Sequence, residues 1–159
     1  MLRRITGFHP DDEGHWVAEL DCLHNQHVRH RPPWEERPWV VDEAGRRNRL
    51  GQALDCPLCD RAELPDGLVV ARTAGPFDPS NLPAGLRRRH RVAASTWGRL
   101  RVLEGRVGLD LEVEPPLRRV LDAADSQALP PSVPHLLQPE GPFLLAVDFL
   151  TRPGPASPG

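Results

Sequence analysis

A length of 159 residues suits one ordinary domain or two small ones, and a net charge of −2 argues against a dedicated nucleic-acid binder, so nucleic acid is not an expected partner. The 19 prolines and 13 glycines disfavour long helices and predict short strands joined by turns. The chain starts without the apolar stretch of a secretory signal and contains no apolar run long enough to span a bilayer. We therefore expect a cytoplasmic protein with no membrane partner.

The composition changes near residue 62. All three cysteines, five of the seven histidines and three of the four tryptophans lie before this point. Residues 63–83, which end in GPFDPSNLP, are rich in proline, glycine and aspartate, as expected of a linker that leads into a strand over residues 68–72. We predict a module over residues 1–62, a second domain over residues 63–152 and a disordered tail over residues 153–159.

The sequence of the first module predicts little regular structure. Residues 16–20, WVAEL, read as a strand whose Glu19 faces away from the apolar side chains. Val40 and Val41 could begin a second strand. Residues 43–54 predict a short, weak helix that is interrupted at Gly51.

The sequence of the second domain predicts five strands, over residues 85–92, 97–104, 106–112, 117–121 and 143–150. Residues 97–104 and 106–112 each alternate apolar with charged side chains, and Gly105 between them predicts a hairpin turn. At least five short strands with no long helix predict a mainly β fold, either a small barrel or a sandwich.

Cysteine and histidine in the first module have the spacing of a zinc site. Cys22-x-His24 lies near one end and Cys56-x-x-Cys59 near the other. Zinc takes four such ligands in a tetrahedron, and residues two apart on an extended strand point to the same side. A module of about 60 residues buries little surface, and structural zinc would supply folding free energy. We therefore predict a structural zinc held by Cys22, His24, Cys56 and Cys59.

Other interpretations of these residues stay open. Cys56 and Cys59 could form a redox pair, although no βαβ pattern surrounds them. Cys22 could be a buried apolar side chain. His27 or His30 could replace His24 as a ligand, or lie on the surface.

The first module resembles a short bacterial family of unknown function. The resemblance covers nearly all of residues 1–60, and the residues that carry it are WVAELDC at 16–22, HNQHVRH at 24–30, PPW at 32–34, RPW at 37–39 and CPLC at 56–59. It implies no activity. The histidines and arginines of residues 27–31, followed by Trp34, could form a polar and aromatic binding surface, although tryptophans are more often structural.

Residues 130–135, PPSVPH, resemble the second metal-binding motif of the cupins, whose pattern is G-x-x-x-x-x-P-x-G-x-x-H-x-x-x-N. The first proline and His135 fit this pattern. Ala124 and Ser132 stand where it has glycine, and Pro139 stands where it has asparagine.

The first cupin motif is incomplete, because Gly98 stands in place of its glutamate and His90 only falls near its first histidine. The resemblance implies His90 and His135 as ligands of zinc, iron or manganese, with open coordination positions. Asp148 or Glu104 could add a carboxylate. Alternatively, Asp148 pairs with one of the many arginines.

A closer resemblance covers about residues 70–150, through LPAGL at 82–86, TWGRL at 96–100, VLEG at 102–105 and VDF at 147–149. These residues are similar to the cupin domain of the tellurite-resistance protein B and YeaR families. The resemblance implies a single-domain cupin barrel (a double-stranded β-helix or jelly-roll) and a role in tellurite or related oxyanion stress. Small cupins often dimerise, so the barrel could also form a homodimer. The chain lacks a G-x-G nucleotide signature, so the methyl transfer of some relatives is not carried over.

The predicted function is therefore a metal-binding stress-response protein whose barrel binds a small molecule or oxyanion. Arg87 or Arg89 could contact that oxyanion, or could simply be solvated. Two alternatives remain. One is a metal-dependent cupin enzyme, similar to an oxygenase or isomerase. The other is an adaptor whose zinc module binds a protein or a nucleic acid.

Overall fold

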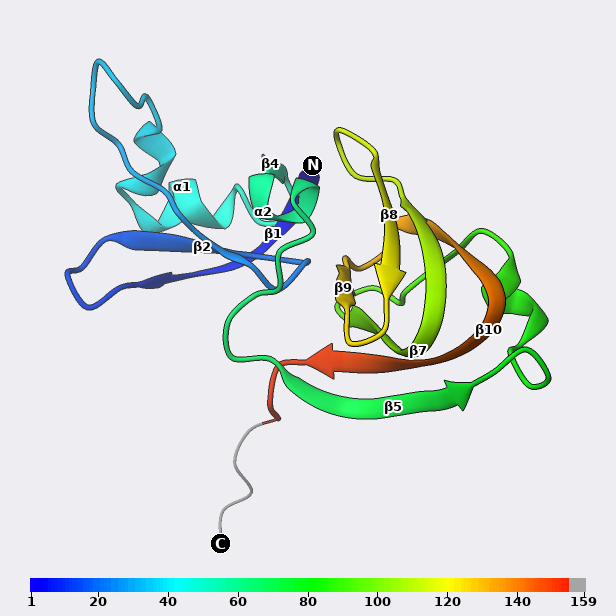
Figure 1. The fold of residues 1–159 in the computed structure, drawn as a ribbon. Coiled ribbons are helices and arrows are strands. Elements are labelled where there is room, and N and C mark those ends of the chain that lie inside the picture. Colours follow the sequence, from blue (N-terminus) through cyan, green and yellow to red (C-terminus); the bar gives the residue numbers. More distant parts are fainter. Residues whose placement is uncertain (155–159) are drawn as a thin grey trace, which may run out of the picture. The chain divides into compact units, whose positions relative to one another are not determined.

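The computed structural model describes residues 1–154, so residues 155–159, most of the predicted tail, lie outside the described residues. The chain divides into two compact units, Met1–Pro57 and Leu58–Gly159 (Figure 1). This division falls a few residues before the boundary predicted after residue 62. Both units are built from antiparallel strands with little helix, which confirms the mainly β prediction.

The N-terminal unit is a four-stranded antiparallel sheet in the order β3-β2-β1-β4, with strands β1 (Leu2–Pro10), β2 (Trp16–Leu20), β3 (Asn25–His27) and β4 (Ala53–Asp55). The strand predicted over residues 16–20 is confirmed. Asp11 makes the turn between β1 and β2, because its Oδ1 accepts hydrogen bonds from the backbone N–H groups of Glu13 and His15. Small apolar side chains, including Val17, Ala18 and Leu20, form the buried core.

The segment between β3 and β4 differs from the prediction. Val40 belongs to the 3-10 helix η1 (Pro38–Val40) and not to a strand. Helix α1 (Glu43–Arg47) is capped by Asp42, whose side chain accepts a hydrogen bond from the N–H of Gly45 at 2.6 Å. The helix ends well before residue 54, because Gly51 has a φ of +78° and the chain then enters β4.

The C-terminal unit contains a six-stranded antiparallel sheet. Its path runs β5-β10-β7-β8, while β6 pairs with β10 and β9 pairs with β7. The strands are β5 (Val69–Phe77), β6 (His90–Arg91), β7 (Trp97–Leu111), β8 (Leu117–Asp122), β9 (Ser126–Leu129) and β10 (Pro134–Thr151). Two short helices, α2 (Pro57–Asp60) and η2 (Ala84–Arg87), complete the unit. Of the strand predicted over residues 85–92, only β6 forms, and residues 85–87 belong to η2.

Gly105 does not form the predicted hairpin turn. Strand β7 continues through it, and both halves of β7 pair with β10. Buried positions in β7 are even-numbered from Gly98 to Val102 and odd-numbered from Val107, so the alternation changes phase across an irregularity with Gly105 at φ +76°. A Cβ at Gly105 would lie 2.1 Å from the carbonyl oxygen of Pro142, so only glycine fits this close approach.

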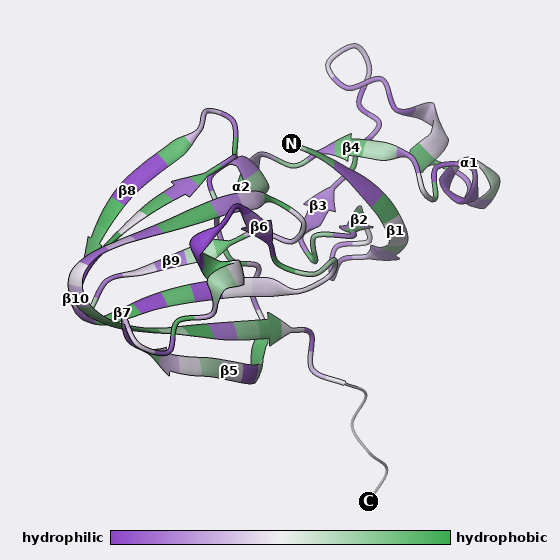
Figure 2. Cartoon of the chain, turned by 90° about the vertical axis from the view of Figure 1, so that its right-hand side faces the viewer, coloured by the Kyte–Doolittle hydropathy of each residue, from purple (hydrophilic) through white to green (hydrophobic). Residues whose placement is uncertain are grey.

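The core of the C-terminal unit lies on the inner face of its curved sheet. Alternating apolar and polar side chains along β7 give the green and purple banding of this strand in Figure 2. Trp97, Leu100 and Leu145 are among the completely buried large side chains of this unit. None of the helices among residues 1–154 is both long and apolar enough to cross a membrane.

Candidate functional site

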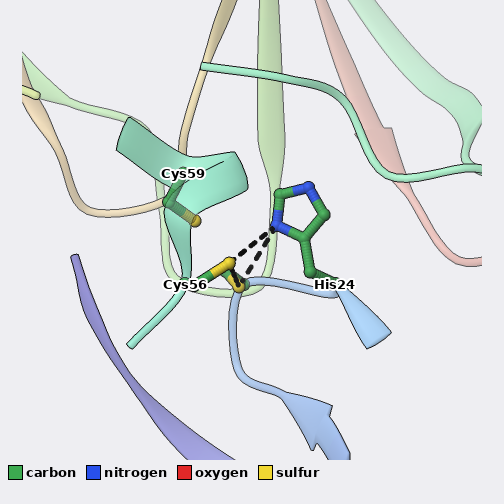
Figure 3. A group of neighbouring side chains, drawn as sticks. His24, Cys56 and Cys59 are labelled. Atoms are coloured by element: carbon green, nitrogen blue, oxygen red, sulfur yellow. Dashed lines mark hydrogen bonds between the residues drawn. The ribbon is translucent and has the colours of Figure 1, made fainter. Parts of the chain in front are cut away.

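Four buried side chains of the predicted zinc site come together in the structure: Cys22, His24, Cys56 and Cys59. Their ligand atoms all lie within 4.8 Å of one another. The Sγ atoms of Cys22 and Cys56 are 3.9 Å apart, and the Nδ1 atom of His24 lies 3.5 Å and 3.4 Å from them. Figure 3 shows Cys56 and Cys59 with His24, whose Nδ1 faces the sulfur atoms.

These distances match the edges of a zinc tetrahedron. With Zn–S bonds of about 2.3 Å and Zn–N bonds of about 2.0–2.1 Å, a tetrahedron has S···S edges of about 3.8 Å and S···N edges of about 3.6 Å. The spacing of the donor atoms of Cys22, His24 and Cys56 agrees with these values to a few tenths of an ångström. The donor set therefore fits a tetrahedral metal ion.

A tight turn brings Cys22 and His24 together. Strand β2 ends at Leu20, and Leu23 has a φ of +69° in the turn that follows. The N–H of Leu23 donates to the carbonyl oxygen of Leu20, and the N–H of Leu20 donates to that of His24. The two ligands thus converge through a reversal of the chain and not through the strand alternation predicted from the sequence.

The second pair of ligands begins where β1 and β4 meet. The N–H of Cys56 donates to the carbonyl oxygen of Met1 at 2.8 Å, which places Cys56 beside the start of β1. Pro57 then opens helix α2, a position where proline needs no hydrogen-bond partner. Cys59 follows within this single turn of helix.

The sulfur atoms make the centre attractive to positive charge. Burial alone would lower the pKa of His24, but hydrogen bonds to Cys22 and Cys56 and attraction to their sulfurs raise it to about 9. A metal cation bound at Nδ1 would take the place of the proton that these sulfurs stabilise.

The two other histidines considered as ligands lie outside this cluster. His27 is exposed, and its Nε2 lies 2.9 Å from Oδ2 of Asp11. The Nδ1 atom of His30 accepts a hydrogen bond from the N–H of Arg37 at 3.1 Å. The structure therefore assembles His24, and neither His27 nor His30, with the three cysteines.

In the C-terminal unit, His90 and His135 face each other across the pairing of β6 with β10. Their ring centroids are 4.1 Å apart. The Nδ1 atom of His90 lies 2.8 Å from the carbonyl oxygen of Arg88, and that of His135 lies 3.2 Å from that of Val133. Nδ1 therefore carries the proton and donates in each ring, which leaves a lone pair on each Nε2 atom.

Burial keeps His135 neutral. It lowers the pKa of the ring to about 4, with a further contribution from the charge of His90 when that ring is protonated. A neutral imidazole whose Nδ1 donates to a backbone carbonyl is the form in which histidine binds metals through Nε2.

A cavity of about 500 Å³ adjoins this histidine pair. Its walls are mainly apolar, and its polar side chains are His90, His135, Arg72 and Arg91. The Arg72 guanidinium lies 4.0 Å from the centroid of the Phe149 ring. An apolar cavity of this size with a few convergent polar groups is the usual form of a small-molecule site.

Neither of the arginines predicted to contact an oxyanion lines this cavity. Arg87 donates to the carbonyl oxygen of Pro79, and Arg89 pairs with Glu112. Sequence reasoning did not identify Arg72 as a candidate, because it was assigned only to a strand that follows a linker. The sequence alone does not mark an arginine on such a strand as functional. Only the pairing of β5 with β10 places Arg72 beside Phe149.

Asp148 belongs to an ion cluster on β5, β7 and β10. Its carboxylate accepts hydrogen bonds from Arg99 and Arg101 at 2.8–3.1 Å and from the hydroxyl of Thr73 at 2.8 Å. Burial would raise the pKa of Asp148, but these hydrogen bonds lower it below its ordinary value. Among the described residues, Asp148 forms no three-residue cluster of metal-binding side chains with the two histidines. Glu104, the other carboxylate considered, is exposed.

Two family models match separate parts of the chain. Residues 6–63 match the family described as a protein of unknown function, DUF3565, and this match includes all four residues of the Cys/His cluster. Residues 72–146 match the TehB-like domain, and this match includes His90 and His135. No curated protein matches the chain.

Solved structures are similar to the C-terminal part at low identity. A crystal structure of a protein from Escherichia coli K12 has 20% identity and a TM-score of 0.51, covering 58% of this chain and 98% of that one. TehB from Haemophilus influenzae has 17% identity and a TM-score of 0.47, covering 55% of this chain and 32% of TehB. The iron(II) form of HppE has 20% identity and a TM-score of 0.34, covering 39% of this chain and 33% of HppE. The likeness to the E. coli protein concerns the fold alone.

Proposed function

We propose that this chain is a zinc-stabilised ligand-binding protein of the tellurite-resistance type. In this proposal the Cys/His cluster holds a structural zinc ion, and the C-terminal sheet is a cupin barrel that binds a small ligand or oxyanion. The observation that carries the proposal is the grouping of four buried donors, Cys22, His24, Cys56 and Cys59, within 4.8 Å of one another, three of them at the spacing of a zinc tetrahedron.

The donor set favours a structural metal over a catalytic one. Catalytic zinc sites keep one coordination position for water or substrate, whereas three cysteines and one histidine fill all four positions. The ligands are also buried, which restricts access of a substrate. An N-terminal unit of this size buries little surface, so zinc would supply much of its folding free energy.

The backbone supports the assignment of the C-terminal unit to the cupins. Ala124 has a φ of +74° and Ser132 has a φ of +61°, in the left-handed region that glycine adopts without strain. These are the two positions at which the second cupin motif has glycine. Both residues thus adopt the backbone conformation that a glycine at these positions would adopt readily, which supports the proposed motif. The match of residues 72–146 to the TehB-like domain supports the same assignment.

The cavity beside His90 and His135 is the proposed ligand site. The two Nε2 lone pairs can bind zinc, iron or manganese, with the remaining positions filled by water or by the ligand. Arg72 and Arg91 supply positive charge for an oxyanion at the cavity. We leave Asp148 out of this site because arginines and a threonine engage its carboxylate.

Metal analysis and tellurite titration test the proposal together. We expect wild-type protein to contain one zinc that is lost in Cys56→Ser/Cys59→Ser, and a second metal that is lost in His90→Ala/His135→Ala. Calorimetric titration with tellurite should give saturable binding that the second variant abolishes and the control His27→Ala retains. Tellurite binding that is absent from wild type, or equal in all variants, would refute the ligand site, and a zinc content unaffected by the cysteine substitutions would refute the structural centre.

A further inference from the structure

Another, smaller pocket lies in the N-terminal unit. None of the residues that line it belongs to the Cys/His cluster. It has a volume of about 210 Å³ and is lined by residues 14–16, 28–31 and 40–41. Drug-sized ligands occupy pockets of roughly 300–1,000 Å³, so this one suits a smaller ligand of about ten heavy atoms. Its lining includes two arginines and two histidines and no acidic residue.

Two side chains that line this pocket have a buried nitrogen without a hydrogen-bond partner, His15 at Nδ1 and Arg29 at Nε, and Arg29 is the one that is always charged. A buried, unpaired donor on a charged group destabilises the fold, and a ligand that accepts its hydrogen bond recovers that free energy. A guanidinium group pairs in a planar, two-bonded geometry with carboxylates and phosphates.

His30 provides a second donor. Because its Nδ1 accepts a hydrogen bond from the N–H of Arg37, the proton of the neutral ring is on Nε2. His15 contributes less to anion binding, since its Nδ1 already lies 3.4 Å from Glu13 and 3.6 Å from Asp11. An anion in the pocket could therefore bind to the side chains of Arg29 and His30. Arg31, on the same segment, adds a further positive charge to the lining.

The remaining wall is apolar. It is formed by Trp16, Val28, Val40 and Val41. Arg46 holds this wall in place, because its guanidinium lies 3.6 Å from the centroid of the Trp16 ring and its Nη1 donates to the carbonyl oxygen of Val40 at 2.7 Å. A ligand in this pocket would thus meet positive charge on one side and an aromatic and aliphatic surface on the other.

We propose that this pocket binds a small organic anion, in which a phosphate or carboxylate group pairs with Arg29 and His30 and a small apolar group packs against Trp16 and Val28. The inference is independent of the ligand proposed for the C-terminal cavity. It also gives a role to the run of histidines and arginines at residues 27–31, which the metal centre does not use.

Titration of the full-length, zinc-loaded protein tests this inference. Phenyl phosphate, benzoate and inorganic phosphate are added separately at constant ionic strength, and binding is followed by the NMR signals of the Gly14 amide and the Trp16 indole. We expect saturable shifts at these signals, with phenyl phosphate or benzoate binding more tightly than inorganic phosphate. The comparison of the first two probes identifies the preferred anionic group.

Variants show whether Arg29 carries the binding. We expect Arg29→Gln to weaken the affinity at least tenfold, while the control Arg47→Gln, which changes an exposed arginine paired with Glu43, leaves it unchanged. His30→Gln provides a second test should Arg29→Gln fail to fold, and it should also weaken binding. Shifts that do not saturate, or an affinity that is the same in wild type and in the folded pocket variants, would overturn the inference.

Discussion

Replacing Cys56 by serine removes one of the four donors of the proposed zinc site and leaves the other three. Apparent binding free energies of structural zinc in small domains are about 10–16 kcal/mol at neutral pH. Divided among four donors, this gives about 2.5–4 kcal/mol for each ligand. Because serine is not among the usual zinc ligands, we expect Cys56→Ser to bind zinc roughly 10²- to 10³-fold more weakly than wild type.

The weaker binding should also reduce the stability of the N-terminal unit. Binding of a metal to the folded form stabilises it in proportion to the logarithm of the ratio of metal concentration to dissociation constant. At a free zinc concentration that saturates both proteins, a 10²- to 10³-fold change corresponds to about 3–4 kcal/mol. A chelator should remove the zinc contribution from both proteins and so bring their stabilities close together.

Competition with a chromophoric chelator measures the zinc affinity, and thermal unfolding with and without zinc measures the stability. His27→Ala is the matched control, because His27 is an exposed histidine near His24 in the chain that lies outside the cluster. The reasoning fails if Cys56→Ser and His27→Ala bind zinc with the same affinity, or if a chelator leaves the unfolding of wild type unchanged.

Three further substitutions test the C-terminal unit. Asp148→Asn removes the carboxylate from Arg99 and Arg101, and we expect a loss of about 1–3 kcal/mol because both arginines are about a third exposed. Since the folded pKa of Asp148 is lowered, this contribution is present above the ordinary value of 3.8 and is lost as the pH falls through the folded pKa, so variant and wild type should converge in acid. Gly105→Ala should cost about 2–5 kcal/mol, because the added Cβ meets backbone at 2.1 Å and the φ is positive. Ala124→Gly should raise the free energy of unfolding by about 0.5–1 kcal/mol. Glycine adopts the left-handed conformation without strain, and this gain exceeds the cost of a more flexible unfolded chain.

Urea denaturation followed by fluorescence, to which the buried Trp97 contributes, measures these changes. Each substitution has a control in the same unit. Asp122→Asn removes an exposed partner of Arg106 and should cost less than about 1 kcal/mol. Gly85→Ala adds a Cβ in open space and should change stability by less than about 0.5 kcal/mol. Ala94→Gly, where φ is not positive, should lower stability. A substitution that behaves like its control would contradict the structural reason given for it.

The grouping of the three cysteines with His24 could be predicted from the sequence because their types and spacing are typical of a metal site. Few structures other than a shared metal site would use the side chains of Cys22, His24, Cys56 and Cys59 together. The path of the chain between them was harder to predict, since the turn at Leu23 depends on a left-handed backbone that leucine seldom adopts.

The prediction failed where one pattern fits two structures. A change of phase in the apolar alternation around Gly105 is expected for a hairpin turn and also for an irregularity within one long strand. Only the pairing of both halves of β7 with β10 distinguishes them, and that pairing is a long-range property of the fold. His90 and His135 were predicted together through the cupin resemblance, whereas the ion cluster of Asp148 depends on arginines that β7 places beside it.

X-ray absorption at the zinc edge, recorded on the purified full-length protein, tests the central claim most directly. The account predicts three sulfur ligands at about 2.3 Å and one nitrogen ligand at about 2.0–2.1 Å. The nitrogen contribution should disappear in His24→Ala and persist in His27→Ala. A zinc shell made only of nitrogen and oxygen, or a protein that binds no zinc, would contradict the account.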